Sequence, residues 1–257
     1  MTWDIGVAGA VITSNSLPQE SSAQETFQSQ VRKNNPDVLA LQGLDGYTDE
    51  RLMAKAAQWG HPYSVILKGP GSAIGLTSRR PIINCEKLTK GMGHGLLHCR
   101  TFGIDFFTVR LSADDLQMRR REAGLILFRI QNLTRSGGEA ILLGDLNAVS
   151  PFDAALYQAN ASAVEPDYSV LATFMSAPMI DPCARHTGNP ADRISLLVEG
   201  NGDPSQKTIG GRTFRRRIDY ILATPKLADE CVGCEIAAGG ENRSPSGHSL
   251  IMVDFDH

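Results

Sequence analysis

Short apolar runs alternate with longer segments of helical periodicity along most of the chain. Apolar residues that recur about three or four positions apart predict amphipathic helices. These helices are expected at residues 18–33, 49–59, 113–133, 151–159 and 168–174. Short apolar runs bounded by Gly, Pro or Asn predict strands. The strands are expected at residues 5–12, 37–41, 63–67, 73–76, 82–88, 96–101, 104–109, 141–143, 217–223 and 250–255.

This order of elements predicts one α/β domain over residues 1–257. Strands that follow one another at short spacing favour hairpins within a sheet, and the intervening helices favour layers that cover the sheets. We therefore expect a four-layer sandwich, in which two packed mixed β-sheets are flanked by helices. The chain has 257 residues and is 42% hydrophobic, which is enough to bury a large core. In such a sandwich, loops at the strand ends of both sheets would meet in one cleft.

The stretch at residues 139–151 contains the most informative polar side chains. An apolar run at residues 141–143 ends at Gly144, and Asp145 and Asn147 follow, one residue apart. On an extended backbone, side chains at positions i and i+2 point to the same side. Because burying a carboxylate and an amide at the end of a core strand is costly, this pair indicates a functional site. The alternative is a turn in which both residues only cap the backbone.

Six motifs along the chain, in this order, resemble those of one known family. They are residues 36–43 (PDVLALQG), 71–81 (GSAIGLTSRRP), 106–111 (FFTVRL), 144–147 (GDLN), 217–222 (RIDYIL) and 246–248 (SGH). Each motif alone is weak, but their order over almost the whole chain is specific. The chain resembles the endonuclease/exonuclease/phosphatase superfamily, and this resemblance implies the same sandwich fold.

The chain both matches and departs from the polar site of that superfamily. The matching residues are Asp145, Asn147, Asp219 and His248. Gly43 stands where the superfamily has the principal glutamate ligand of a catalytic divalent cation, and Gly247 stands where it has an aspartate. Arg110 takes the place of a mid-chain histidine, and residues 4–10 offer no asparagine at the end of the first strand.

These departures predict that the usual metal centre is lost. Glycine supplies no ligand atom, and small hard cations need several oxygen ligands in defined positions. We therefore predict no metal ligands and no cofactor. The alternative is a site for Mg²⁺ or Mn²⁺ in which Asp45, Asp254 or Asp256 replaces the missing carboxylates.

The retained residues predict a proton-handling site, and the resemblance assigns the catalytic roles to His248, Asp145, Asn147 and Asp219. A carboxylate on one ring nitrogen would fix the tautomer of His248 and leave the other nitrogen for proton transfer. By the resemblance, Asp219 supplies that carboxylate. Asp145 would be a second acid or base, and Asn147 a neutral hydrogen-bond donor to an oxyanion.

Two arginines are predicted to bind the substrate. Arg110 and Arg217 could supply part of the positive charge that phosphoryl transfer requires. For Arg110 the alternative is an ion pair with Asp145 or another carboxylate.

Composition narrows the expected substrate and location. The net charge of −3 and the pI of about 6.1 argue against a protein that grips long nucleic acid, so we expect a small-molecule substrate. No apolar run is long enough to span a membrane, and the first residues lack the features of a signal peptide. The sequence carries no signal of oligomeric state.

The five cysteines complete this picture. Cys231 and Cys234 have zinc-like spacing, but a second pair is missing, so buried thiols in a reducing compartment are expected. The chain is predicted to be cytoplasmic.

Three functions follow from these observations. The first is a small-molecule enzyme that works without metal in the ancestral cleft, for example in a cyclisation or an isomerisation. The second is a metal-dependent phosphodiesterase or phosphatase with unusual ligands. The third is a non-catalytic binding module. We favour the first, because the proton-handling residues remain while two metal ligands are missing.

Overall fold

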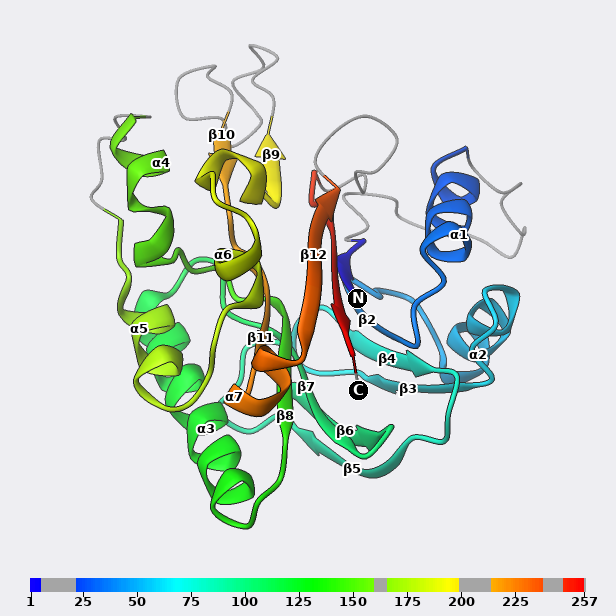
Figure 1. Cartoon of the computed structure of the whole chain (residues 1–257). Coiled ribbons are helices and arrows are strands. Elements are labelled where there is room, and N and C mark those ends of the chain that lie inside the picture. Colours follow the sequence, from blue (N-terminus) through cyan, green and yellow to red (C-terminus); the bar gives the residue numbers. More distant parts are fainter. Residues whose placement is uncertain (6–21, 160–165, 199–213, 238–246, 257) are drawn as a thin grey trace.

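Two packed sheets form the centre of the molecule (Figure 1). The structure is a computed structural model that describes residues 1–5, 22–159, 166–198, 214–237 and 247–256. Among these residues the first sheet has the strand order β12-β13-β1-β2-β4-β3. Its strands are β1 (Thr2–Asp4), β2 (Val38–Gln42), β3 (Tyr63–Leu67), β4 (Ile74–Ser78), β12 (Cys231–Ala237) and β13 (Leu250–Phe255).

The second sheet has the strand order β11-β8-β7-β6-β5. Its strands are β5 (Ile83–Leu88), β6 (Leu96–Thr101), β7 (Ile104–Arg110), β8 (Ala140–Asp145) and β11 (Asp219–Ala223). Both sheets are mixed, because β1 pairs with β2 and β7 pairs with β8 in parallel while their other pairs are antiparallel.

Helices cover the outer faces of both sheets (Figure 1). The first sheet carries α1 (Ser22–Asn34) and α2 (Asp49–Gln58), and the second carries α3 (Leu116–Arg135) and α5 (Ser169–Ser176). The short elements are η1 (Pro151–Asp153), α4 (Ala154–Ala159), α6 (Pro182–His186), η2 (Pro190–Arg193), α7 (Pro225–Asp229) and the hairpin of β9 (Leu196–Val198) with β10 (Phe214–Arg216). The predicted four-layer sandwich is confirmed. None of the helices in the described ranges is both long and apolar enough to cross a membrane.

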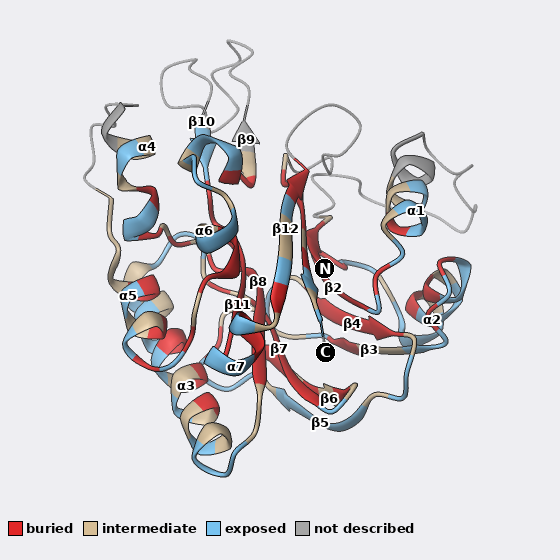
Figure 2. Ribbon diagram, in the orientation of Figure 1, coloured by how far each residue is buried: buried red, intermediate tan, exposed pale blue. Residues whose placement is uncertain are grey.

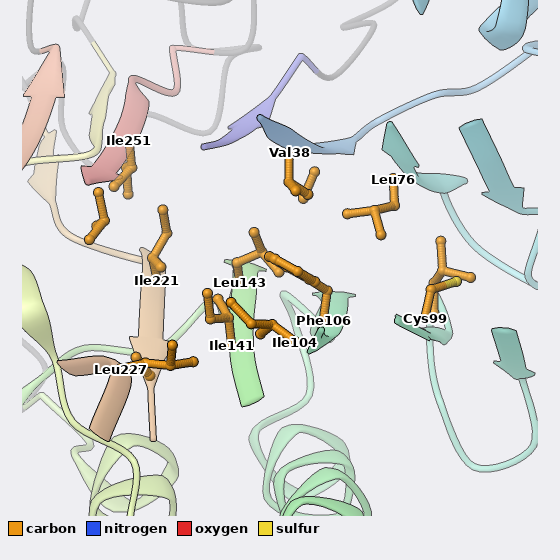
Figure 3. Packing of buried hydrophobic residues seen from close by; sticks show 14 of the residues in the cluster. Val38, Leu76, Cys99, Ile104, Phe106, Ile141, Leu143, Ile221, Leu227 and Ile251 are labelled. Atoms are coloured by element: carbon orange, nitrogen blue, oxygen red, sulfur yellow. The ribbon is translucent and has the colours of Figure 1, made fainter. Parts of the chain in front are cut away.

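Three clusters of buried side chains hold the layers together. Between the sheets, Val38 and Ile251 of the first sheet share a cluster with Phe106, Leu143 and Ile221 of the second (Figure 3). A second cluster joins the second sheet to α3 and α5, and a third joins the first sheet to α1 and α2. The central strands are therefore buried on both faces, whereas the helices expose their outer sides (Figure 2).

Most predicted elements are present with small shifts in their ends. The long helix begins at Leu116 because the side chain of Asp115 accepts a hydrogen bond from Met118 N (3.0 Å) and caps it. The first strand differs more. It was predicted at residues 5–12, but β1 ends at Asp4, and residues 6–12 lie outside the described part of the chain.

The cysteines differ from the prediction of buried thiols. Cys85 and Cys99 form a disulfide between β5 and β6, and Cys183 and Cys234 form one between α6 and β12, with Cα atoms 4.2 and 5.2 Å apart. Cys231 is a buried free thiol. Pairing depends on which strands become neighbours, which the spacing of cysteines along the chain does not reveal. Because Cys234 is oxidised, the Cys231–Cys234 spacing does not form a zinc site.

Arg217 lies in the interior and does not have the predicted role in substrate binding. Its side chain is 0% exposed, Nη2 donates to Asp181 Oδ1 (2.7 Å) and Nη1 donates to Asp153 Oδ2 (3.3 Å). Asp153 also accepts a hydrogen bond from Arg193 Nε (2.8 Å). These buried ion pairs join the segment between β10 and β11 to η1, η2 and the N-terminus of α6. Arg217 is therefore a structural residue, because its side chain is buried and its guanidinium binds two buried carboxylates.

We predict that Arg217→Met lowers the free energy of unfolding by about 3–5 kcal/mol, because it leaves the buried Asp181 without its guanidinium partner and Asp153 with Arg193 alone. The matched control is Arg185→Met, which removes the exposed pair with Asp229 and should cost about 1 kcal/mol or less. Urea denaturation measures both. Equal losses in the two variants would contradict the structural role of Arg217.

His61 is a second buried polar residue with a fixed environment. It is 0% exposed, and its Nε2 and Nδ1 lie 2.7 Å from Pro36 O and Thr77 Oγ1. A carbonyl oxygen only accepts, so Nε2 carries the proton and Nδ1 accepts from the Thr77 hydroxyl. Both partners are satisfied by the neutral ring. Burial lowers the pKa of His61 below its usual 6.5, and the positive charge of Arg79 acts in the same direction.

This shift predicts a loss of stability at acidic pH. A histidine whose folded pKa is lowered contributes fully above pH 6.5, and its contribution is lost as the pH falls and the unfolded chain takes up the proton. Urea denaturation at pH 7, 6 and 5 should therefore show a shallower decline of stability for His61→Gln than for the unmodified protein. His186→Gln, at an exposed position, is the control. An unchanged slope in His61→Gln would refute the assignment.

Candidate active site

The residues selected from β7, β8 and β11 lie side by side at one end of the second sheet. Asp219 is opposite Asp145 across β11 and β8, and Asp145 is opposite Arg110 across β8 and β7. Asn147 follows β8, and His248 lies just before β13 of the first sheet. We call this end of the sandwich, marked by Arg110, Asp145 and Asp219, the site end.

Gly144 allows β8 to deliver Asp145 to the site end. Its φ is +133°, and a Cβ there would lie 2.0 Å from Val109 O and 3.1 Å from Gln42 Nε2. Only glycine fits this conformation and this space. The glycine of the Gly-Asp-x-Asn motif therefore lets β7 approach β8 and leaves room for a buried side chain of the other sheet.

His248 and Asp219 form the predicted pair. Nδ1 of His248 lies 3.0 and 2.9 Å from Oδ1 and Oδ2 of Asp219, and the hydroxyl of Ser195 also donates to Asp219 Oδ2 (2.7 Å). Burial works against charge on the ring, but the Asp219 carboxylate outweighs it and raises the pKa of His248 to about 10. The pair fixes the ring so that Nδ1 carries a proton toward Asp219. Its part in catalysis stays a prediction.

Asp145 is held by Asn147. The backbone N–H of Asn147 donates to Asp145 Oδ1 (2.9 Å), and Asn147 Nδ2 donates to Asp145 Oδ2 (2.8 Å) and to Leu111 O (2.9 Å). Burial raises the pKa of Asp145 to about 7, and the charge of Asp219 adds to this rise. Both amide hydrogens of Asn147 are thus in use, so the expected role as an oxyanion donor is not supported. Asn147 thus holds the carboxylate of Asp145, and its part in catalysis stays a prediction.

Asp4 is a site residue that the sequence analysis missed. It ends β1, pairs with Gln42 in the parallel register of β1 and β2, and is 0% exposed. One ligand atom each of Asp4, Asp145 and His248 lies within 4.8 Å of the other two. The available signal was the end of the first strand, which lies several residues earlier than its apolar pattern suggested.

Arg110 lies against both buried carboxylates. Its Nε is 3.4 Å from Asp4 Oδ2 and 3.7 Å from Asp145 Oδ2, and its side chain is 21% exposed. The ion-pair alternative for Arg110 is therefore confirmed. The partial exposure also leaves part of the guanidinium open to a ligand, so contact with substrate stays a prediction.

The alternative ligands do not lie in this cluster. Asp45 accepts hydrogen bonds from Ser72 Oγ (2.8 Å) and Ala73 N (3.2 Å). Asp254 and Asp256 are exposed at the far end of β13 from His248. Asp4, and not any of these residues, supplies the additional carboxylate.

Gly43 and Gly247 share a backbone property. Their φ angles are +73° and +84°, in a region that other residues rarely adopt. An acidic side chain at either position would therefore strain the backbone.

The donor set of the cluster fits a divalent cation. Two carboxylates and one imidazole nitrogen converge, and the imidazole is supported behind by Asp219, as is usual for a metal-bound histidine. The prediction that no residues could ligate a metal is thus not supported by the structure. Two oxygens and one nitrogen suit Mn²⁺ or Zn²⁺ better than Mg²⁺, which prefers oxygen ligands.

Comparisons with solved structures support this fold. An AP endonuclease from Archaeoglobus fulgidus superposes with a TM-score of 0.64 at 18% identity, covering 90% of this chain and 93% of that one. The 3′ phosphatase NExo from Neisseria, bound to a product DNA hairpin, gives 0.70 at 18% identity, covering 100% and 98%. An endonuclease/exonuclease/phosphatase from Beutenbergia cavernae gives 0.63 at 15% identity, covering 98% and 69%.

These neighbours correct the expectation that no long nucleic acid is involved. One of them is bound to a DNA hairpin, so the fold is compatible with nucleic acid, and the net charge of this chain was not a sufficient reason to exclude it. No curated protein sequence matches the chain. The profile of the Endonuclease/Exonuclease/phosphatase family matches residues 1–246, and the chain belongs to this family.

Proposed function

We propose that this chain is a phosphoester hydrolase that acts on phosphate esters, including those of nucleic acid, with a divalent cation bound by Asp4, Asp145 and His248. The position of Asp4 carries the proposal. Its carboxylate adds a second acidic ligand beside Asp145, at a site where Gly43 and Gly247 supply no carboxylate. The proposal replaces the metal-free enzyme as the favoured function.

The charges of the cluster support a bound cation. Asp4, Asp145 and Asp219 are buried carboxylates, and Arg110 is the guanidinium beside two of them. A cation on the free ring nitrogen would replace the proton that His248 carries at its raised pKa, and one divalent cation would neutralise the two negative charges that this group then keeps. When bound, the cation would polarise a phosphoryl oxygen and lower the pKa of a bound water.

The chain's own residues fix the geometry for this chemistry. Asp219 binds Nδ1 of the His248 ring, so Nε2 is the ring nitrogen that would ligate the cation. Asn147 holds both oxygens of Asp145. Arg110 offers a partly exposed positive charge to an anionic phosphate. Hydrolysis would form a P–O bond to a water oxygen, break the P–O bond to the leaving alcohol, and move one proton from the water to that alcohol.

Nucleic acid is the substrate class that two observations support. The solved neighbours include an AP endonuclease and a DNA-bound 3′ phosphatase. In this chain, Arg215 and Arg216 are exposed on β10, and Arg216 O accepts a hydrogen bond from the backbone of Ser195, whose hydroxyl binds Asp219. Exposed arginines next to an active site suit a phosphate backbone.

A metal-independent enzyme is the second candidate, and Arg110 is the observation that favours it. Its guanidinium already lies against Asp4 and Asp145, so it could compensate their charge without an ion. In that case the cleft would run acid/base chemistry on a small molecule, such as a cyclisation or an isomerisation.

We predict that Asp4→Asn weakens the binding of Mn²⁺ by about tenfold or more, because a ligating carboxylate is lost. Isothermal titration calorimetry on EDTA-dialysed protein measures this. Asp45→Asn is the matched control, because Asp45 binds Ser72 and Ala73 outside the cluster, and it should keep the affinity. Absence of Mn²⁺ binding in the unmodified protein, or equal affinity in Asp4→Asn, would refute the metal site and leave the second candidate.

Turnover gives a separate prediction. In the presence of Mn²⁺ the protein should release phosphate from a 3′-phosphorylated DNA hairpin or cleave bis(p-nitrophenyl) phosphate, and His248→Gln should lower kcat by about 10²–10⁴-fold. His98→Gln, on β6 with its ring stacked on Phe107, is the control. Turnover that EDTA does not change, or that His248→Gln retains, would count against the proposed mechanism.

A further inference from the structure

His94 lies at the site end but has no role in the site described above. Leu96 of β6 is opposite Val109 of β7, so the residues just before Leu96 lie beside the end of β7 at Arg110. Continued by one residue, this register brings Gly95 level with Arg110 at the end of the row of Asp219 and Asp145. His94 is the next residue along the chain, and the charge of Arg110 acts on its ring.

The segment before β4 holds the ring of His94. Ser72 N donates to His94 Nδ1 (2.8 Å), and Ser72 Oγ donates to Asp45 Oδ2 (2.8 Å). β4 belongs to the first sheet, so His94 joins the two sheets at the site end. This contact links the Gly43 region, where the superfamily glutamate is missing, to the second sheet.

Glycines of the same segment are required for this arrangement. A Cβ on Gly71 would lie 2.3 Å from His94 Nδ1 and 2.7 Å from Gly93 O, and a Cβ on Gly69 would lie 2.4 Å from His94 O. Any side chain at these positions would displace the ring or the backbone behind it. Gly69, Gly71 and the backbone N–H of Ser72 thus form a close-fitting site for the ring of His94, which we call the seat of His94. A residue other than glycine at position 69 or 71 would not fit.

The hydrogen bond from Ser72 fixes the tautomer. A backbone N–H only donates, so Nδ1 must accept and the neutral ring carries its proton on Nε2. Burial lowers the pKa of His94, and the positive charge of Arg110 adds to this effect, which keeps the ring neutral. Nε2 is on the opposite side of the ring from the atom that Ser72 binds, and within the described part of the chain it forms no hydrogen bond.

We propose that His94 is a substrate-binding residue, whose Nε2–H donates a hydrogen bond to a phosphoryl oxygen held by Arg110 from the neighbouring strand. The inference deepens the proposed phosphoester hydrolase and rests on it for the substrate class. A neutral donor beside a guanidinium suits a phosphate, because it adds a directional contact without another charge.

The first test is direct binding of inorganic phosphate to the metal-free protein, followed by long-range ¹H–¹⁵N spectra of the imidazoles. The resonance of His94 Nε2 should shift in a saturable manner, while that of His98, whose Nε2 binds Asp105, should not. His94→Gln should weaken the calorimetric phosphate affinity by about tenfold.

A second variant separates positioning from folding. Gly71→Ala should displace the ring and weaken phosphate binding to a similar extent, whereas Gly124→Ala, where a Cβ meets nothing within 4 Å, should not. With a phosphodiester, His94→Gln should raise KM more than it lowers kcat.

Binding that leaves His94 Nε2 unshifted, or no phosphate binding at all, would overturn the role of His94. Because this test needs neither metal nor turnover, its result is independent of whether the protein hydrolyses phosphoesters. If the protein hydrolyses phosphoesters but the His94 Nε2 resonance does not shift, only the role of His94 is refuted. If the resonance shifts but no hydrolysis is detected, only the proposed function is refuted.

Discussion

The concentration of buried carboxylates at the site end is the constraint on which the rest of the site depends. Asp4, Asp145 and Asp219 are each no more than 2% exposed. A buried charge without a partner destabilises a protein by several kcal/mol, which is about the cost of removing one partner from a buried ion pair. Positively charged side chains must therefore lie close to these three carboxylates. Arg110 and His248 meet this requirement, and both are held by the carboxylates they compensate.

The sandwich makes this cluster possible because it brings two sheets to one edge. β1 and β13 of the first sheet deliver Asp4 and His248, whereas β8 and β11 of the second deliver Asp145 and Asp219. The apolar cluster between the sheets sets their separation. The polar cluster of Asp4, Asp145, Asp219 and His248 thus lies between the two sheets. A cation or a phosphate bound there would contact residues of both sheets.

The sequence predicted the parts of the molecule that follow from local pattern. Most of the periodic helices and buried strands, and the motifs that contain Asp145 and His248, lie where expected, whereas the first strand does not. Asp4 was missed, because a strand as short as Thr2–Asp4 has no periodicity to read. Arg217 was misassigned, because an arginine within a run of arginines resembles a solvated residue until its buried acidic partners are known. His94 gave no signal, since its environment is formed by glycines distant in the chain.

The chain segment that lacks the superfamily glutamate and the surroundings of His94 are connected through Ser72. At Gly43 the backbone adopts φ +73°, and the next carboxylate along the chain, Asp45, binds Ser72 and Ala73 instead of a cation. That contact fixes the segment that holds His94. In the proposed site the additional acidic ligand is Asp4, at the end of β1. Under the proposed function, the absence of the glutamate would change where a cation is held and would not by itself remove the reason to bind one.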